Sequence, residues 1–166
     1  MKKIPLTQGQ FALVDDDDYD YLMQWKWYAH YSHGTKSFYV RRHGRKSEYD
    51  TSRPTMHMAR VIMNAQKGEY VDHRDHNTLD NQRSNLRVCT NSQNSMNRGP
   101  TKSNTSGYKG VVWDKSTNKW HARIQVNERV HHLGLFTSKH DAGRAYNLAS
   151  MMYHGEFAYT NKIKEK

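Results

Sequence analysis

The stretch "SMNRGPTKSNTS", from Ser95 to Ser106, constrains the fold of this chain more than any other. It holds Gly, Pro and many hydroxyl or amide side chains, and almost nothing that a core could bury. Such composition is typical of a connection between folded segments. Apolar patterns lie on both sides of it, and 166 residues suffice for one ordinary domain or two small ones. We therefore expect two modules.

The segment after this connection predicts a small sheet followed by a helix. "YKGVVWD", "KWHARIQV" and "RVHHLGLF" are rich in β-branched and aromatic residues and predict three strands. Ser138 with Asp141 predicts a capping box that opens a helix, and Gly155 is placed to end it. In the middle strand the two-residue period puts Trp120, Ala122 and Ile124 on the face that packs on the helix. The opposite face carries His121, Arg123 and Gln125.

The segment before the connection predicts short strands with hairpins and two helices. The run Asp15 to Asp18 suits the negatively charged first turn of a short helix, a simpler interpretation than a metal site. In "TMHMARVIMNA" the apolar residues recur at helical spacing, which predicts an amphipathic helix over Thr55–Ala65.

The charge of the chain favours a polyanion as partner. Lys and Arg number 26 against 16 Asp and Glu, a net charge of +10, and such an excess is typical of proteins that bind nucleic acid. One predicted hairpin interleaves cations with Phe38 and Tyr39 and suits a DNA groove or backbone, although an ordinary solvated hairpin has the same composition. Its cations are Lys36, Arg41, Arg42, Arg45 and Lys46.

Residues 70–94 concentrate oxygen and imidazole groups. A strand that ends after Tyr70 and Val71 would present Asp72 and His73 on opposite faces, and Asn94 would fall in an early turn of a short helix. A carboxylate and an amide suit a hard cation such as Mg²⁺, and a neutral imidazole beside them can take a proton from water. A solvated loop rich in turns remains the alternative on composition alone.

The chain offers few signals for other chemistry or for a membrane. Cys89 is the single cysteine, so a zinc ribbon built from several cysteines is excluded. No run of about 18 apolar residues occurs, and the N-terminus "MKKIP" lacks the apolar region of a secretory signal. We expect an intracellular protein, in the cytoplasm of a host cell, with no membrane partner.

The stretch "VDHRDHNTLDNQRSNLRVCTNSQN" resembles the HNH endonucleases encoded by mobile introns and by phages. "WKWYA" and "MHMARVIM" also resemble the segments that precede this motif, so the resemblance covers roughly residues 5–97. It implies a ββα-metal fold that binds one divalent cation, Mg²⁺ or Mn²⁺, through Asp72 and Asn94. His73 would be the general base, and Asn85 would hold the loop that aims it. At Ala59 many relatives carry His, and if that His contacts DNA, affinity or site choice would differ in this chain.

Residues 106–161 resemble the DNA-binding domain of the ethylene-response-factor (ERF) or APETALA-2 family. The resemblance rests on residues such as Gly110, Trp120, Ala145 and Tyr146, with the closing His154 and Gly155. It implies a three-stranded antiparallel sheet, packed on one helix, that enters the major groove of DNA. At Val112 and Asp114 relatives often carry Arg, so their base preference cannot be transferred. The implied contacts are Lys109, Arg123, Gln125 and His132.

Together these features predict an α+β chain: an HNH module at 1–97 with its metal-binding core near 70–97, a linker at 98–106, an ERF-type domain at 107–161 and a basic tail at 162–166. The predicted function is a site-recognising, metal-dependent endonuclease of the homing type that acts on double-stranded DNA as a monomer. It would nick one strand and leave 5′-phosphate and 3′-hydroxyl ends. Two alternatives are a DNA-binding regulator with an inactive HNH module and an RNA-directed or structural role.

Overall fold

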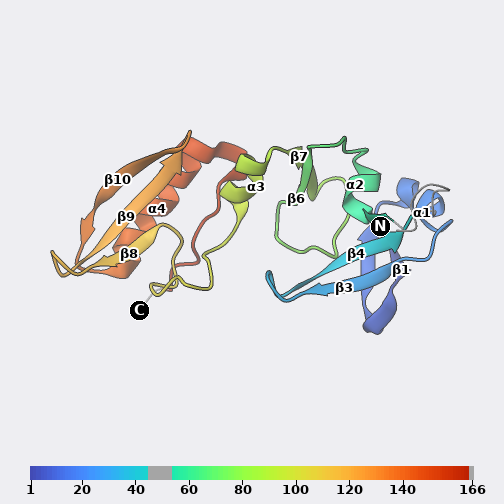
Figure 1. The fold of residues 1–166 in the computed structure, drawn as a ribbon, viewed down its shortest axis with the longest axis horizontal. Coiled ribbons are helices and arrows are strands. Elements are labelled where there is room, and N and C mark those ends of the chain that lie inside the picture. Colours follow the sequence, from blue (N-terminus) through green and yellow to red (C-terminus); the bar gives the residue numbers. More distant parts are fainter. Residues whose placement is uncertain (45–53, 165–166) are drawn as a thin grey trace. The chain divides into compact units, whose positions relative to one another are not determined.

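The computed structural model describes residues 1–44 and 54–164. The chain divides into two compact units, 1–91 and 92–166, and each is described by itself (Figure 1). The predicted DNA contacts Arg45 and Lys46 lie outside the described residues. Both units mix helix and sheet, consistent with the predicted α+β class.

The described residues of the first unit, 1–44 and 54–91, form three separate antiparallel sheets. β1 pairs with β2, β6 pairs with β7, and β4 lies between β3 and β5. Leu22, Val14 and Met58 are fully buried in its core. The elements in chain order are β1 (Lys2–Pro5), a short 3-10 helix (Thr7–Gly9), β2 (Phe11–Val14), α1 (Asp16–Leu22), β3 (Tyr28–Ser32), β4 (Ser37–His43), β5 (Thr55–His57), α2 (Met58–Ile62), β6 (Tyr70–His73) and β7 (Leu86–Cys89).

The helix predicted over Thr55–Ala65 is shorter than its apolar spacing indicated. Only Met58–Ile62 is helical, and Thr55–His57 forms β5, which pairs with β4. At the other end Asn64 adopts a left-handed backbone with φ of 48°, which ends the helix. The apolar spacing correctly predicted that Met58 and Ile62 are buried. The residues expected to form the first turn of the helix instead form β5, because they pair with β4.

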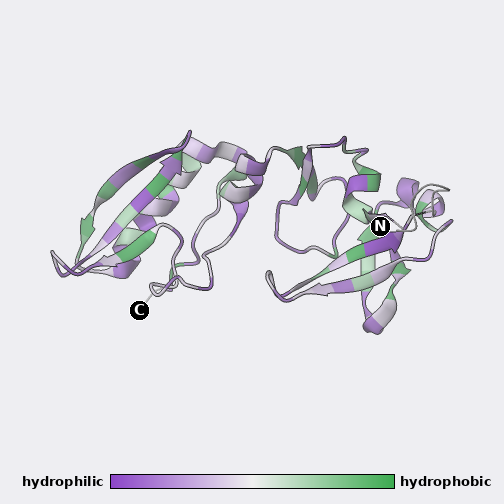
Figure 2. Cartoon of the chain, viewed as in Figure 1, coloured by the Kyte–Doolittle hydropathy of each residue, from purple (hydrophilic) through white to green (hydrophobic). Residues whose placement is uncertain are grey.

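The second unit is a three-stranded antiparallel sheet packed on one long helix, as the strand and capping signals predicted. β9 (Lys119–Val126) lies between β8 (Val111–Asp114) and β10 (Arg129–Phe136), and α4 (Lys139–His154) covers one face (Figure 1). Hydrophilic and hydrophobic residues alternate along β9 (Figure 2), because alternate side chains face α4. Ser138 caps the helix by accepting a hydrogen bond from the His140 N–H at 3.2 Å. A 3-10 helix (Gly155–Phe157) follows α4.

The division between the units falls after Asn91, so all of α3 (Asn91–Asn97) except its first residue belongs to the second unit. The Lys109 ammonium donates hydrogen bonds to the carbonyls of Ser95, Met96 and Arg98, at 3.0, 2.6 and 2.7 Å. These carbonyls belong to the last turn of α3, where a cation is favourable. Burial lowers the pKa of Lys109 to about 8.

The polar stretch predicted as a linker is hydrogen-bonded within the second unit. Ser106 is buried and its hydroxyl donates to the carbonyl of Val111 at 2.8 Å. The Asn104 amide donates to the carbonyl of Tyr108 at 2.8 Å. The Ser and Asn side chains that suggested flexible chain thus satisfy the backbone of turns that lead into β8. In 1–44 and 54–164, no helix has the length and apolar character needed to cross a bilayer.

Candidate active site

The candidate site begins at the end of β6, where Asp72 and His73 lie side by side in the chain. β6 pairs with β7 in the register that sets Asp72 opposite Arg87 and His73 opposite Leu86. Both polar side chains are buried, with exposed fractions of 8% for Asp72 and 9% for His73. Burial of a carboxylate and an imidazole has a large cost in free energy unless each has a partner.

Asp72 is paired with Arg87, a residue that the sequence analysis did not single out. Oδ2 of Asp72 accepts from Nε of Arg87 at 2.9 Å and from Nη2 at 2.6 Å. Both side chains are almost completely buried, so the pair fixes the carboxylate in one rotamer. Strand register was the missing signal, because Arg87 lies directly across from Asp72 in the β6–β7 hairpin.

His73 is held by a buried amide. Its Nε2 lies 3.4 Å from Oδ1 of Asn81, and Asn81 has an exposed fraction of 1%. Because a carbonyl oxygen can only accept, Nε2 carries the proton in this contact and Nδ1 is the basic nitrogen. Burial lowers the pKa of His73 below its usual range, although Asn81 and the nearby carboxylate of Asp72 act in the opposite direction. The imidazole is therefore neutral near pH 7, the form that a general base requires.

Asn85 ties together the two ends of the loop between β6 and β7. Its Oδ1 accepts from the Asp75 N–H at 3.1 Å, and its Nδ2 donates to the Asp80 carbonyl at 2.9 Å. Its own carbonyl accepts from the Arg74 N–H at 2.9 Å. The side chain thus bonds to the backbone of the loop that follows His73.

The acidic run at the start of α1 anchors the same loop from a distance of more than 60 residues in sequence. Asp18 accepts from Nε and Nη2 of Arg83 at 2.9 and 2.7 Å. Asp15 accepts from the Arg83 N–H at 2.8 Å and from the Gln82 amide at 3.1 Å. Asp18 is buried, so the interpretation of this run as a solvated helix start was wrong for Asp18. The contacts fix the loop just before Asn85.

Replacing Arg83 with Ala is expected to lower the free energy of unfolding of the first unit by about 1–2 kcal/mol. The reason is that the mostly buried carboxylate of Asp18 loses the guanidinium that donates two hydrogen bonds to it. Thermal unfolding followed by circular dichroism measures the change. Arg144→Ala is the matched control, since its ion pair with Asp141 is exposed on both sides and should contribute under about 0.5 kcal/mol. Equal losses in the two variants would contradict the anchoring role of Arg83.

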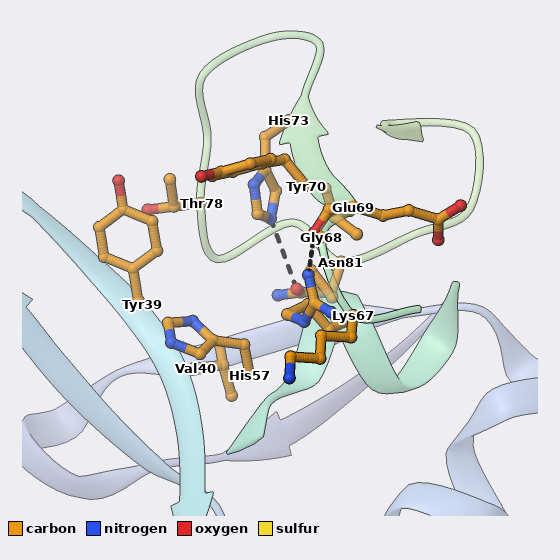
Figure 3. Close-up of a pocket in the computed structure, with 13 residues that line it drawn as sticks. Tyr39, Val40, His57, Lys67, Gly68, Glu69, Tyr70, His73, Thr78 and Asn81 are labelled. Atoms are coloured by element: carbon orange, nitrogen blue, oxygen red, sulfur yellow. Dashed lines mark hydrogen bonds between the residues drawn. The ribbon is translucent and has the colours of Figure 1, made fainter. Parts of the chain in front are cut away.

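A pocket of about 500 Å³ opens beside His73 in the first unit. His73 and Asn81 line one part of it, and Tyr39 and His57 from the neighbouring strands β4 and β5 line another (Figure 3). Val40, Ala59 and Val71 contribute apolar wall. Lys67 and Tyr70 also line the pocket and are exposed.

His57 is a neutral group in the wall of this pocket. Burial, together with smaller effects of the cations Arg41 and Arg60, lowers its pKa to about 4. The unfolded chain, with a pKa near 6.5, binds this proton more readily than the folded chain. The stability that neutral His57 contributes is therefore complete above pH 6.5 and is lost as the pH falls from 6.5 to 4.

We expect His57→Gln to reduce the pH dependence of unfolding between pH 6.5 and 4 by about 1–2 kcal/mol, a figure reduced for the partial solvent exposure of the ring. Urea unfolding at several pH values measures it. A slope unchanged from that of the parent chain would show that His57 titrates normally in the folded state.

The predicted DNA contacts have different surroundings. In the first unit Lys36 is exposed in the turn before β4, whereas the Arg42 guanidinium lies 4.3 Å from the centre of the Trp25 ring. Arg41 lies on β4 opposite Tyr28 and His57. In the second unit Arg123, Gln125 and His132 are exposed on the sheet, and Lys109 is bonded to α3 as described.

The donor set proposed for a metal is a carboxylate and an amide. Asp72 is the residue before the last in β6 and belongs to the first unit, whereas Asn94 lies on α3 in the second unit and is partly buried. Oxygen donors of this kind fit a hard dication that keeps waters and shares a phosphate. No group of three or more His, Cys, Asp or Glu side chains suited to a metal occurs among residues 1–44 and 54–164.

Comparison with known proteins identifies the family. A family model described as HNH endonuclease matches residues 65–96, the segment that holds β6, β7 and most of α3. A protein of Acanthamoeba polyphaga mimivirus, described as an uncharacterized HNH endonuclease, is 32% identical over 160 residues, which cover 94% of this chain and 77% of the relative. The chain belongs to the HNH endonuclease family.

A second relative of this HNH chain comes from a phage. Protein 3.8 of Escherichia phage T7 is 40% identical over 65 residues, or 39% of this chain and 54% of that protein. No solved structure matches. Membership of the HNH family implies a nuclease that binds DNA, and HNH nucleases generally depend on a divalent metal.

Proposed function

We propose that the chain is a site-recognising, metal-dependent DNA endonuclease that nicks one strand and leaves 5′-phosphate and 3′-hydroxyl ends. The observation that carries the proposal is His73, a buried and neutral imidazole held next to the Asp72–Arg87 pair. A group in that state, within the segment that matches the family, is suited to take a proton from water.

In the proposed reaction, His73 receives the proton of the attacking water on Nδ1, while Nε2 donates to Asn81 and keeps the ring oriented. Asn85 keeps the loop behind the ring in place. Arg87 holds the Asp72 carboxylate in one orientation. Asp72 and Asn94 would hold one divalent cation, Mg²⁺ or Mn²⁺, which would supply neutralisation of charge on the phosphate and on the departing 3′ oxygen.

The second unit is proposed to read duplex DNA in the manner of the ERF family. The sheet face opposite α4 carries exposed Arg123 and Gln125 on β9. His132 on β10 donates to or accepts from His121 at 2.8 Å with the rings stacked. Arg and Gln are the side chains that read guanine and adenine edges in the major groove. Lys36, Arg41 and Arg42 of the first unit would add contacts to the phosphate backbone.

We do not assign a DNA contact to Lys109, although the resemblance to the ERF family implied one. Its ammonium donates to three backbone carbonyls of the α3 turn, and a phosphate contact would require it to give up these bonds. We assign it to positioning α3, the helix that carries Asn94.

A nicking mode follows from one HNH site in each chain, since one site hydrolyses one strand at a time. A homing-type enzyme that acts as a monomer would then need a second event for a double-strand break. The alternative of a DNA-binding regulator is favoured by one observation, because Arg87 already neutralises the carboxylate of Asp72 and competes with a dication for it.

Relaxation of supercoiled plasmid in Mg²⁺, in Mn²⁺ and in EDTA tests the proposal. We expect open-circular product with either cation and none with EDTA, and strand-resolved mapping should place the nicks in one strand of a preferred site. DNA binding without relaxation in either cation would favour the regulator. Linear product as the first species would contradict the nicking mode.

A further inference from the structure

The pocket beside His73 is lined by more apolar and aromatic side chains than proton transfer to His73 requires. Its walls include the apolar side chains of Val40, Ala59 and Val71, and the rings of Tyr39 and Tyr70. A volume of about 500 Å³ falls in the range of about 300–1,000 Å³ that is typical of sites for small organic molecules. A water and a cation would need far less apolar surface.

One buried donor in this pocket has no partner among the residues that the structure describes. Asn81 uses Oδ1 for His73, but its Nδ2 makes no hydrogen bond and is shielded from solvent. An unsatisfied buried N–H group costs about 1–3 kcal/mol. Asn81 also lines the pocket beside His73 (Figure 3), so this amide indicates an acceptor that the described residues do not supply.

The charges around the pocket fit a flat neutral group better than a phosphate. The Arg60 guanidinium is occupied by three backbone carbonyls, those of Ala65, Gln66 and Glu69. His57 is neutral at pH 7 because burial lowers its pKa to about 4. Lys67 is the exposed cation among the lining residues. The lining thus combines apolar and aromatic side chains with the N–H groups of Asn81 and of the neutral His57 ring.

We propose that this pocket binds a single unstacked nucleobase, from a nucleotide next to the phosphate that His73 helps to cleave. The base packs against Tyr39 and Tyr70 and accepts a hydrogen bond from Nδ2 of Asn81, and Lys67 at the rim meets the phosphate of the same nucleotide. All four bases carry acceptors and flat faces, so the pocket does not select among them. Enzymes that draw a base out of a duplex spend a few kcal/mol, least when the base is unpaired.

This inference rests on the proposed function for its choice of DNA as ligand, but its first test needs no cleavage. The full chain, labelled with ¹⁵N, is titrated with deoxynucleoside monophosphates and, in parallel, with deoxyribose 5-phosphate. We expect the side-chain amide signal of Asn81 to shift with the nucleotides and not with the sugar phosphate. Equal shifts with both compounds, or no shift with either, would overturn the proposal.

Two wall variants examine the same site. Tyr39→Ala and Tyr70→Ala should each weaken nucleotide binding by about 5- to 100-fold, the effect of removing an aromatic ring that stacks on a base. Tyr39→Phe keeps the ring and should bind within about twofold of the parent chain. Tyr70 is 41% exposed, so its variant remains informative if Tyr39→Ala unfolds. If both Ala variants bound nucleotides as tightly as the parent chain, stacking of the base on Tyr39 and Tyr70 would be refuted.

A second test uses DNA and separates this proposal from the nuclease proposal. Duplexes centred on a mapped nick carry 2-aminopurine at each flanking position, with Ca²⁺ in place of Mg²⁺. Fluorescence should rise several-fold at one position for the parent chain and not for Tyr39→Ala. Nicking without any rise in fluorescence would contradict the base-binding pocket but not the nuclease proposal. Nucleotide binding without nicking in Mg²⁺ or Mn²⁺ would contradict the nuclease proposal but not the pocket.

Discussion

Replacement of His73 by Ala is expected to slow DNA nicking by about 10²- to 10⁴-fold, the usual contribution of a general base. Binding of duplex DNA should change by less than about threefold, because the variant loses an interaction needed in the transition state rather than in the bound state. The physical reason is the buried neutral ring, whose Nδ1 takes the proton while Nε2 is directed to Asn81. Single-turnover plasmid nicking and gel-shift titration measure the two quantities.

His76→Asn is the matched control for this prediction. His76 follows in the same loop, is exposed, and has a left-handed φ of 67° that Asn tolerates. Its nicking rate should stay close to that of the parent chain. Should His73→Ala retain most of the parent rate, the assignment of the general base would be wrong, and so would the reaction proposed here.

Replacement of Gly110 by Ala is expected to destabilise the second unit by about 2–6 kcal/mol, combining backbone strain and overpacking. Gly110 has a φ of +75°, and a Cβ there would lie 2.0 Å from Cδ2 of Tyr146 and 2.6 Å from the carbonyl oxygen of Arg123. Tyr146 is fully buried and cannot move aside. The loss is comparable with the whole stability of a unit this size, about 4–11 kcal/mol.

Gly107→Ala separates the two causes. Gly107 also has a left-handed φ, +81°, but nothing lies within 4 Å of an added Cβ, so only the backbone cost of about 1–2 kcal/mol remains. Scanning calorimetry on the full chain follows both variants. A specific DNA footprint should disappear with Gly110→Ala and persist with Gly107→Ala; similar unfolding temperatures for the two variants would contradict the close approach of Gly110 to Tyr146.

Local pattern predicted much of the secondary structure. The three strands and the capped helix of the second unit formed where the alternation of residues and the Ser138 signal placed them. The short helix after Asp15 was predicted in the same way and is confirmed. Each depends on residues within a turn or a strand of one another, and such information is present in a short window of sequence.

The predictions that failed depended on distant partners. The helix over Thr55–Ala65 lost its first turn to pairing with β4, and Asp18 is buried by an Arg 65 residues away in sequence. The polar stretch at 98–106 shows a local limit instead, because Asn104 and Ser106 bond to carbonyl groups four and five residues further along the chain. Composition alone does not reveal which backbone groups a Ser or Asn will satisfy.

By itself the sequence determined the chemistry on offer: a carboxylate and an imidazole at a strand end, an excess of cations, and a motif that places the chain among HNH endonucleases. Tertiary structure alone decided that Arg87 holds Asp72, that Asn81 orients His73 while keeping one donor unsatisfied, and that a pocket opens beside them. The physical reason is that burial and pairing depend on which distant residues pack together. The free energy of that packing is a sum over the whole unit, and no short stretch of sequence contains it.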